Sequence, residues 1–330
     1  MTLYIALPVL ASACSVVMIA HFVLLAEERI TVEGLYGDMY AYIALAESFH
    51  FFNSEVISFR FLMPLISGSI AGLFGLSGME SLGLLTGSLN FIYLLTGFGW
   101  MYYLSLKESA NNSLEVALPT FLLLTLPAFW QGIFLPVPDA LMFCFYGMAL
   151  VGILRQQLAI LLPAAVLGVW VSEWMFLVIL LLPLIDRLRG TSWLPGYMAM
   201  GTAGLLYLAV PLVSTIPESH LVFQSGEWLT SVQEQFAERE TSFPGAFWRS
   251  FALTLPFFVY RIYVTGWNRV TGTLSIWFLL QFGLVYVIAP EIVHRILFMV
   301  MPALVMWQYQ EQTFRNMDSP LNRAGESQMG

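Results

Sequence analysis

Acidic and basic residues mark the two ends of one polar segment in a chain that otherwise carries few charges. The segment runs from Gly37 to Pro64 between long apolar stretches, with Asp38 near its start and Arg60 near its end. A carboxylate can take a proton from an attacking hydroxyl group. A guanidinium stays charged and binds phosphate oxygens through paired hydrogen bonds. These residue types therefore suit proton transfer and the binding of a phosphate group.

Further ionisable residues lie at the edges of, or inside, other apolar stretches: Asp139, Glu173, Glu291, His294 and Arg295. An ionisable side chain at membrane depth costs several kcal/mol unless it is paired or solvated, so such residues are candidates for function. Glu173 is the hardest to explain by packing. The segment 158–185 around it contains no Lys or Arg that would pair with it.

Each candidate also has a structural explanation. Asp38 suits the N-cap of an amphipathic helix over 39–52, and Asp139, which follows two prolines, suits a helix start. Arg60 and Arg295 are typical of side chains that extend from an apolar surface to the membrane interface. Glu173 suits a cap at a helix-breaking turn. The sequence leaves both kinds of role open at each position.

Composition indicates the class of protein. Of the 330 residues, 58% are hydrophobic and 10% are charged, which is more apolar surface than a folded chain can bury from water. The net charge of −8 argues against nucleic acid as a partner. Cys14 and Cys144 both lie in apolar stretches, where small packing residues are expected. We therefore expect an integral protein of the plasma or inner membrane.

Apolar runs of about the length of a membrane-spanning helix recur through the chain. They lie at about 3–25, 61–76, 82–106, 115–135, 139–154, 158–171, 173–186, 194–213, 248–266, 272–289 and 291–308. Their length excludes the short alternating strands of a barrel. The sequence predicts an all-α fold, a polytopic transmembrane helical bundle of about 9–11 segments that forms a single domain over 1–330.

The distribution of basic residues predicts the orientation, because cytoplasmic loops are enriched in Lys and Arg. Lys107, Arg155, the turn 186–189, Arg269 and the tail 309–330 then share the cytoplasmic side, and 26–60 and 214–248 become outer loops. This arrangement requires 61–76 to dip into the membrane or lie on its surface. It also requires 158–186 to break near Ser172-Glu173. Broken or re-entrant helices occur only inside protein or beside a water-filled cavity. Alternatively, 61–76 crosses and 158–186 is one span, with a poorer charge bias.

Several motifs together resemble the GT-C superfamily of polytopic glycosyltransferases. The motifs are Gly37-Asp38-Met39-Tyr40-Ala41-Tyr42, Phe59-Arg60-Phe61-Leu62-Met63-Pro64, Pro138-Asp139-Ala140-Leu141, the segment from Gly168 to Glu173, and His294-Arg295 followed by Pro302. The resemblance covers about residues 1–190 and the last apolar run. Many members have Lys-Glu where this chain has Ser172-Glu173, and many carry a soluble C-terminal domain after the last helix that this sequence does not show.

The resemblance implies transfer of a sugar, with inversion, from a polyprenyl-phosphate-linked donor to an acceptor on the outer face of the membrane. Asp38 is then the expected general base. Asp139 would assist it, or the two carboxylates would hold a divalent cation, Mg²⁺ or Mn²⁺. The expected substrate-binding residues are Arg60, Glu173, His294, Arg295, Tyr40 and Tyr42, with the arginines on the phosphate. The donor sugar and the acceptor, whether glycan, lipid or protein, are not indicated.

Two other classes of protein fit part of the pattern. A transporter or flippase of a lipid-linked or small polar solute also places charges in a cavity within the membrane, and an internal inverted repeat would favour it. A non-catalytic assembly subunit would not need acids at both Asp38 and Asp139. The three classes differ in whether these two carboxylates face one cavity.

Overall fold

The computed structural model describes residues 38–48, 60–108, 137–179, 181–190, 192–213 and 269–288, together with single positions between 244 and 267. Within these ranges the chain forms helices and turns and no strand, so the all-α class is confirmed there. The predicted runs 3–25, 115–135 and 291–308 and the tail 309–330 lie outside the described residues. So does almost all of 214–248 and of 248–266.

The long helices coincide with the apolar runs of the sequence. The elements are α2 (Asp38–Ser48), α3 (Leu62–Phe74), α4 (Met79–Glu108), α7 (Asp139–Arg155), α8 (Leu158–Val169), the 3-10 turn η2 (Glu173–Met175), α9 (Phe176–Ile179), α10 (Leu181–Arg189), α11 (Leu194–Val213) and α15 (Arg269–Ile288). The runs predicted at 82–106, 139–154, 158–171, 194–213 and 272–289 each overlap one of them almost completely. Hydropathy located these helices to within a few residues.

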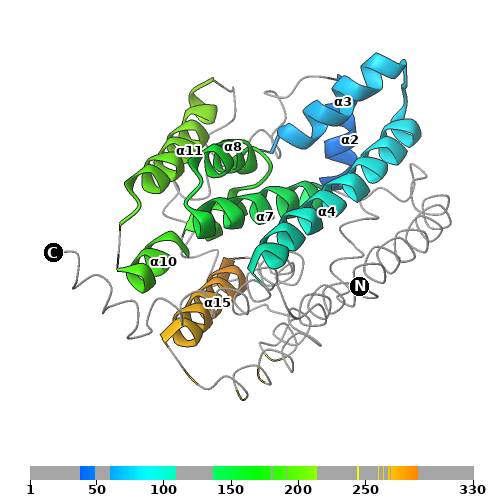
Figure 1. Cartoon of the computed structure of the whole chain (residues 1–330). Coiled ribbons are helices and arrows are strands. Elements are labelled where there is room, and N and C mark those ends of the chain that lie inside the picture. Colours follow the sequence, from blue (N-terminus) through cyan, green and yellow to red (C-terminus); the bar gives the residue numbers. More distant parts are fainter. Residues whose placement is uncertain are drawn as a thin grey trace, which may run out of the picture.

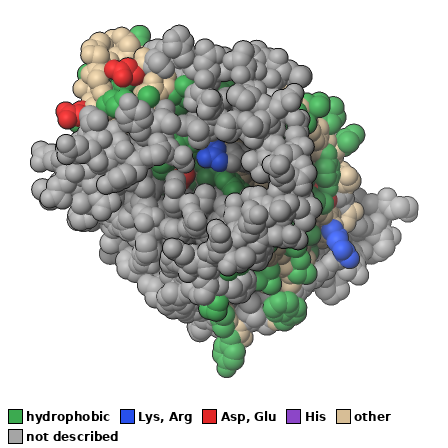
Figure 2. Space-filling model, turned by 180° about the vertical axis from the view of Figure 1, so that it is seen from behind, with side chains coloured by type: hydrophobic (Ala, Val, Ile, Leu, Met, Phe, Trp, Pro, Cys, Tyr) green, Lys and Arg blue, Asp and Glu red, His purple; other side chains and the backbone are tan. Residues whose placement is uncertain are grey.

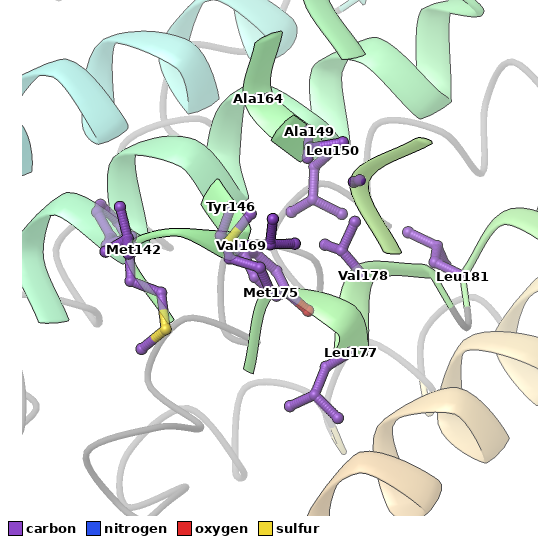
Figure 3. Packing of buried hydrophobic residues seen from close by; sticks show 14 of the residues in the cluster. Met142, Tyr146, Ala149, Leu150, Ala164, Val169, Met175, Leu177, Val178 and Leu181 are labelled. Carbon is purple, nitrogen blue, oxygen red and sulfur yellow. The ribbon is translucent and has the colours of Figure 1, made fainter. Parts of the chain in front are cut away.

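Helix α7 is the centre of the described bundle, with α4 on one side and α8 and then α11 on the other (Figure 1). Nearly all of α7 is buried, including Phe143, Tyr146 and Leu150. Figure 3 shows side chains of α7 packed against Val169, the last residue of α8, and against Met175 and Val178 of the segment that follows α8. The core is therefore built around one helix that has Asp139 at its first residue.

Close approach of α7 and α8 depends on Gly152. A Cβ atom at this position would lie 2.8 Å from the backbone N and Cα of Leu161. We expect Gly152→Ala to destabilise the protein by about 1–3 kcal/mol, because the two backbones must move apart. Gly201→Ala in α11 is the matched control, since its Cβ would meet nothing within 4 Å and alanine favours a helix. Thermal unfolding in detergent should show a lower midpoint for Gly152→Ala alone; equal midpoints would contradict this packing.

The run 61–76 forms α3 and turns sharply into α4. Gly75 has a left-handed backbone (φ 64°), and the N–H of Leu76 donates to the Ala71 carbonyl at 2.9 Å, which ends α3. Among the described residues no single helix is both long and apolar enough to cross a bilayer. Together, α3 and Met79–Gly97 reach that length and apolarity as a pair bent by 116°.

The predicted break near Ser172-Glu173 is confirmed, because 158–186 does not form one continuous helix. Whether this segment crosses the membrane once or twice stays a prediction. Helix α8 ends at Val169, and the N–H groups of Val171 and Ser172 both donate to the Gly168 carbonyl at 3.0 Å. The second half differs from the prediction, because η2, α9 and α10 replace a single helix. Pro183 lies in the first turn of α10, a position where its missing N–H removes no hydrogen bond within the helix.

Candidate functional site

Arg60 lies immediately before α3 and contacts α2. Its Nη1 donates to the hydroxyl oxygen of Tyr42 at 3.5 Å. Tyr42 is buried, whereas Arg60 is half-buried, so the guanidinium keeps access to a ligand. The structure thus brings together two of the predicted substrate-binding residues.

The two residues after Arg60 connect it to the break that follows α8. The rings of Phe61 and Trp170 lie 5.3 Å apart, and the N–H of Leu62 donates to the Trp170 carbonyl at 3.2 Å. The indole N–H of Trp170 is buried and has no hydrogen-bond acceptor within the described part of the chain. A buried donor left open costs about 1–3 kcal/mol.

Asp139 is the first residue of α7 and only 7% of it is exposed. Its place confirms the helix start expected after the two prolines, and an acidic residue there is favoured by the helix dipole. The preceding turn is held by Asn90 of α4, whose side-chain amide donates to the Val137 carbonyl at 3.3 Å. The structure therefore sets Asp139 in a fixed, buried turn where two helices meet.

The backbone places three further candidates. Asp38 is the first described residue of α2 and precedes Tyr42 by four residues, about one helical turn. Tyr40 lies between them. Glu173 begins η2, three residues after the Trp170 carbonyl that holds Leu62. His294 and Arg295 lie outside the described residues.

The far end of α7 carries basic residues. The guanidinium of Arg189 donates to the carbonyls of Ile153 and Leu154, which satisfies groups that a helix end leaves unpaired. Arg155 and the turn 186–189 therefore share one end of the bundle, as the charge distribution predicts. Asp139 is about 25 Å away, because the 17 residues of α7 rise about 1.5 Å each.

Among the coloured side chains on the face drawn in Figure 2 are a basic one, with hydrophobic side chains next to it in the view, and a smaller area of an acidic one. Comparison with known proteins adds nothing to this geometry: no protein-family model, curated protein or solved structure matches the chain. The interpretation of the site therefore rests on its residues.

The described residues contain no group of three or more His, Cys, Asp or Glu side chains that would hold a metal ion. Mg²⁺ and Mn²⁺ prefer oxygen ligands, and Mg²⁺ is often bound through one or two carboxylates and substrate phosphates. Asp139 has the right chemistry for one ligand, and Asp38 would have to supply a second. The cation stays a prediction on these two residues.

A buried polar chain was missed by the sequence analysis. The hydroxyl of Tyr146 in α7 donates to Gln281 Oε1 in α15 at 3.2 Å, and Gln281 Nε2 donates to the Leu177 carbonyl in α9 at 3.0 Å. Gln281 interrupts the apolar run 272–289, and that was the available signal. The chain of hydrogen bonds ties the Leu177 backbone, in the segment after the break, to the two long helices α7 and α15.

Proposed function

We propose that the chain is an integral-membrane glycosyltransferase of the GT-C type. It transfers a sugar from a polyprenyl-phosphate-linked donor to an acceptor on the outer face of the plasma or inner membrane. The observation that supports this most is the junction of α2, Arg60 and the break after α8. There a half-buried guanidinium beside Tyr42 and an open indole N–H on Trp170 offer donors to an anionic ligand.

The surface of the described helices supports membrane insertion. On α11 the large apolar residues Leu194, Met198, Leu205 and Leu208 are more than half exposed, while Ala199 and Ala203 on the other side are buried. On α15, Ile276, Leu279 and Leu280 are likewise more than half exposed. Contiguous apolar surface of this kind is uncommon on soluble monomers. In a polytopic bundle of about 9–11 segments these faces contact lipid.

The separation of charged residues along α7 supports the proposed orientation of the chain in the membrane. Arg155, Arg187 and Arg189 lie at one end, which the preference of cytoplasmic loops for basic residues assigns to the inside. Asp139 lies at the other end. The site at Arg60, Asp38 and Asp139 then faces outward, where the extracellular or periplasmic acceptor is found.

The proposed chemistry assigns one task to each residue. Asp38 takes the proton of the acceptor hydroxyl as the sugar is transferred. Arg60, with Arg295, binds the phosphate and stabilises the charge that grows on it as the glycosidic bond breaks. Tyr40, Glu173 and His294 contact the substrate, and the buried Tyr42 orients the guanidinium of Arg60 through its hydroxyl. Asp139 supports Asp38, or the two hold Mg²⁺ or Mn²⁺, which would neutralise phosphate charge.

The test is to supply purified protein in detergent with a panel of polyprenyl-phosphate sugars and candidate acceptors. Release of the polyprenyl phosphate carrier that depends on the acceptor and the protein supports the proposal. Failure of every donor to release carrier, with protein that remains folded, would contradict it.

A transporter is the second candidate, because the break between α8 and α9 resembles the discontinuous helices that form transporter binding sites. Reconstituted vesicles distinguish the two functions. Movement of a lipid-linked sugar across the bilayer with its phosphate bond intact would identify a transporter, and carrier release would identify a transferase.

A substitution at Glu173 distinguishes a role in substrate binding from a role as a helix cap. We expect Glu173→Gln to lower turnover by about tenfold or more, because the amide keeps most of the hydrogen bonding of a cap and loses the charge that would orient an Arg or a sugar. The measurement is turnover per folded molecule, with expression as the control. Near-normal turnover at unchanged expression would leave Glu173 as part of the architecture only.

A further inference from the structure

The corner between α3 and α4 displays large apolar side chains to the outside. Leu73 is 84% exposed and Phe74 75% exposed, and Leu76 in the turn is exposed as well. No charged residue occurs from Phe61 to Met79. The corner is thus an uncharged apolar projection, and it is separate from the site at Arg60, which lies at the other end of α3.

The α3–α4 corner is held in place by packing of α3 against its neighbouring helices. One side of α3, with Met63, Ser67 and Ala71, is buried against the neighbouring helices α2 and α4. The two glycines of the turn, Gly75 (φ 64°) and Gly78 (φ 88°), adopt left-handed conformations that fix its shape. The fold therefore holds Leu73 and Phe74 in an outward position instead of burying them.

Backbone N–H groups in the α3–α4 corner have hydrogen-bond acceptors within the protein, as a segment in hydrocarbon requires. The N–H groups of Gly75 and Leu76 donate to carbonyls of α3, and the N–H of Gly78 donates to Glu47 Oε1 at 3.2 Å. Backbone donors must be satisfied internally before a segment enters hydrocarbon, because an open donor there costs several kcal/mol. In water these hydrogen bonds would not be required of an exposed turn.

We propose that residues 73–76, the α3–α4 corner, insert into the hydrocarbon of the lipid bilayer as an anchor at the end of α3 opposite Arg60. This inference rests on the proposed membrane function and adds a specific point of insertion. The exposed carboxylates of Glu47 and Glu80 flank the corner and mark the depth at which insertion stops, since charged groups remain at the headgroups.

Lipid is the occupant that the corner fits best. A stable protein interface buries about 800 Å² on each partner and has polar groups at its rim. The corner offers three large side chains on a narrow turn and satisfied backbone donors. Acyl chains require only apolar surface, whereas a second copy of the chain would require a broad complementary face.

The test uses the full chain in liposomes, with Cys14→Ala and Cys144→Ala as the background. Phe74→Cys is compared with Glu80→Cys, each reacted with a water-soluble maleimide or carrying an environment-sensitive dye. Leu205→Cys on the exposed face of α11 is the control for membrane insertion. We expect Phe74→Cys to react about tenfold or more slowly than Glu80→Cys, because a thiol in hydrocarbon does not form the reactive thiolate. Its dye should be quenched by lipids that carry a nitroxide on the acyl chain.

Rapid reaction and no quenching at Phe74→Cys, with quenching at Leu205→Cys, would overturn the anchor and leave the membrane proposal intact. Slow reaction without lipid quenching would also overturn it, because protein and not lipid would then cover the corner. Absence of quenching at both positions would overturn the anchor and the membrane insertion together. Leu73→Cys should repeat the result of Phe74→Cys.

Discussion

Replacement of Asp38 by asparagine is expected to lower the rate of sugar transfer by roughly 10²–10⁴-fold, the usual cost of losing a general base. Asp38 begins α2, one turn before the tyrosine that contacts Arg60. The amide keeps the size of the side chain and much of its capacity to cap the helix, so the protein should remain folded and inserted. The measurement is the transfer rate per folded molecule with saturating donor.

Glu47→Gln is the matched control for Asp38→Asn. Glu47 lies in the same helix, is exposed, and uses Oε1 to accept the N–H of Gly78, a hydrogen bond that the amide oxygen of glutamine preserves. Its transfer rate should stay close to that of the unchanged protein. If Asp38→Asn kept more than about a tenth of the rate, the general base would have to be another residue.

Arg60→Ala is expected to weaken donor binding by about 10–150-fold, because hydrogen bonds to a charged group contribute about 1.5–3 kcal/mol each. The effect should appear in the donor concentration dependence, with a smaller change in the rate at saturation. Tyr42→Phe should have a smaller effect, since it removes the hydroxyl that orients the guanidinium and leaves the charge. Arg295→Ala should resemble Arg60→Ala.

Arg187→Ala provides the control for these variants. Arg187 is exposed on α10, at the end of the bundle opposite Asp139, and should leave donor binding unchanged. An unchanged donor dependence in both Arg60→Ala and Arg295→Ala would make the two arginines membrane-interface anchors.

Local features of the sequence predicted local structure well. Long apolar runs located α4, α7, α8, α11 and α15, because an apolar run of helical length without charges in its interior favours one continuous helix. The polar pair Ser172-Glu173 inside an apolar run correctly indicated a break.

Contacts between residues far apart in the chain could not be predicted from the sequence pattern. The hydrogen bond from Gln281 to the Leu177 carbonyl spans 104 positions, and that from Tyr146 to Gln281 spans 135. Periodicity identifies which face of a helix is apolar, but it does not say which helix will cover that face. The contact of Phe61 with Trp170, which joins Arg60 to the break, belongs to the same class.

The most direct test of the proposed site is a structure of the protein in lipid with a polyprenyl-phosphate sugar bound. We expect the phosphate oxygens about 3 Å from the Arg60 guanidinium. We also expect the carboxylates of Asp38 and Asp139 to line the same cavity around the sugar. A phosphate bound away from Arg60, with the two carboxylates on different faces of the bundle, would contradict the site and the reaction proposed for it.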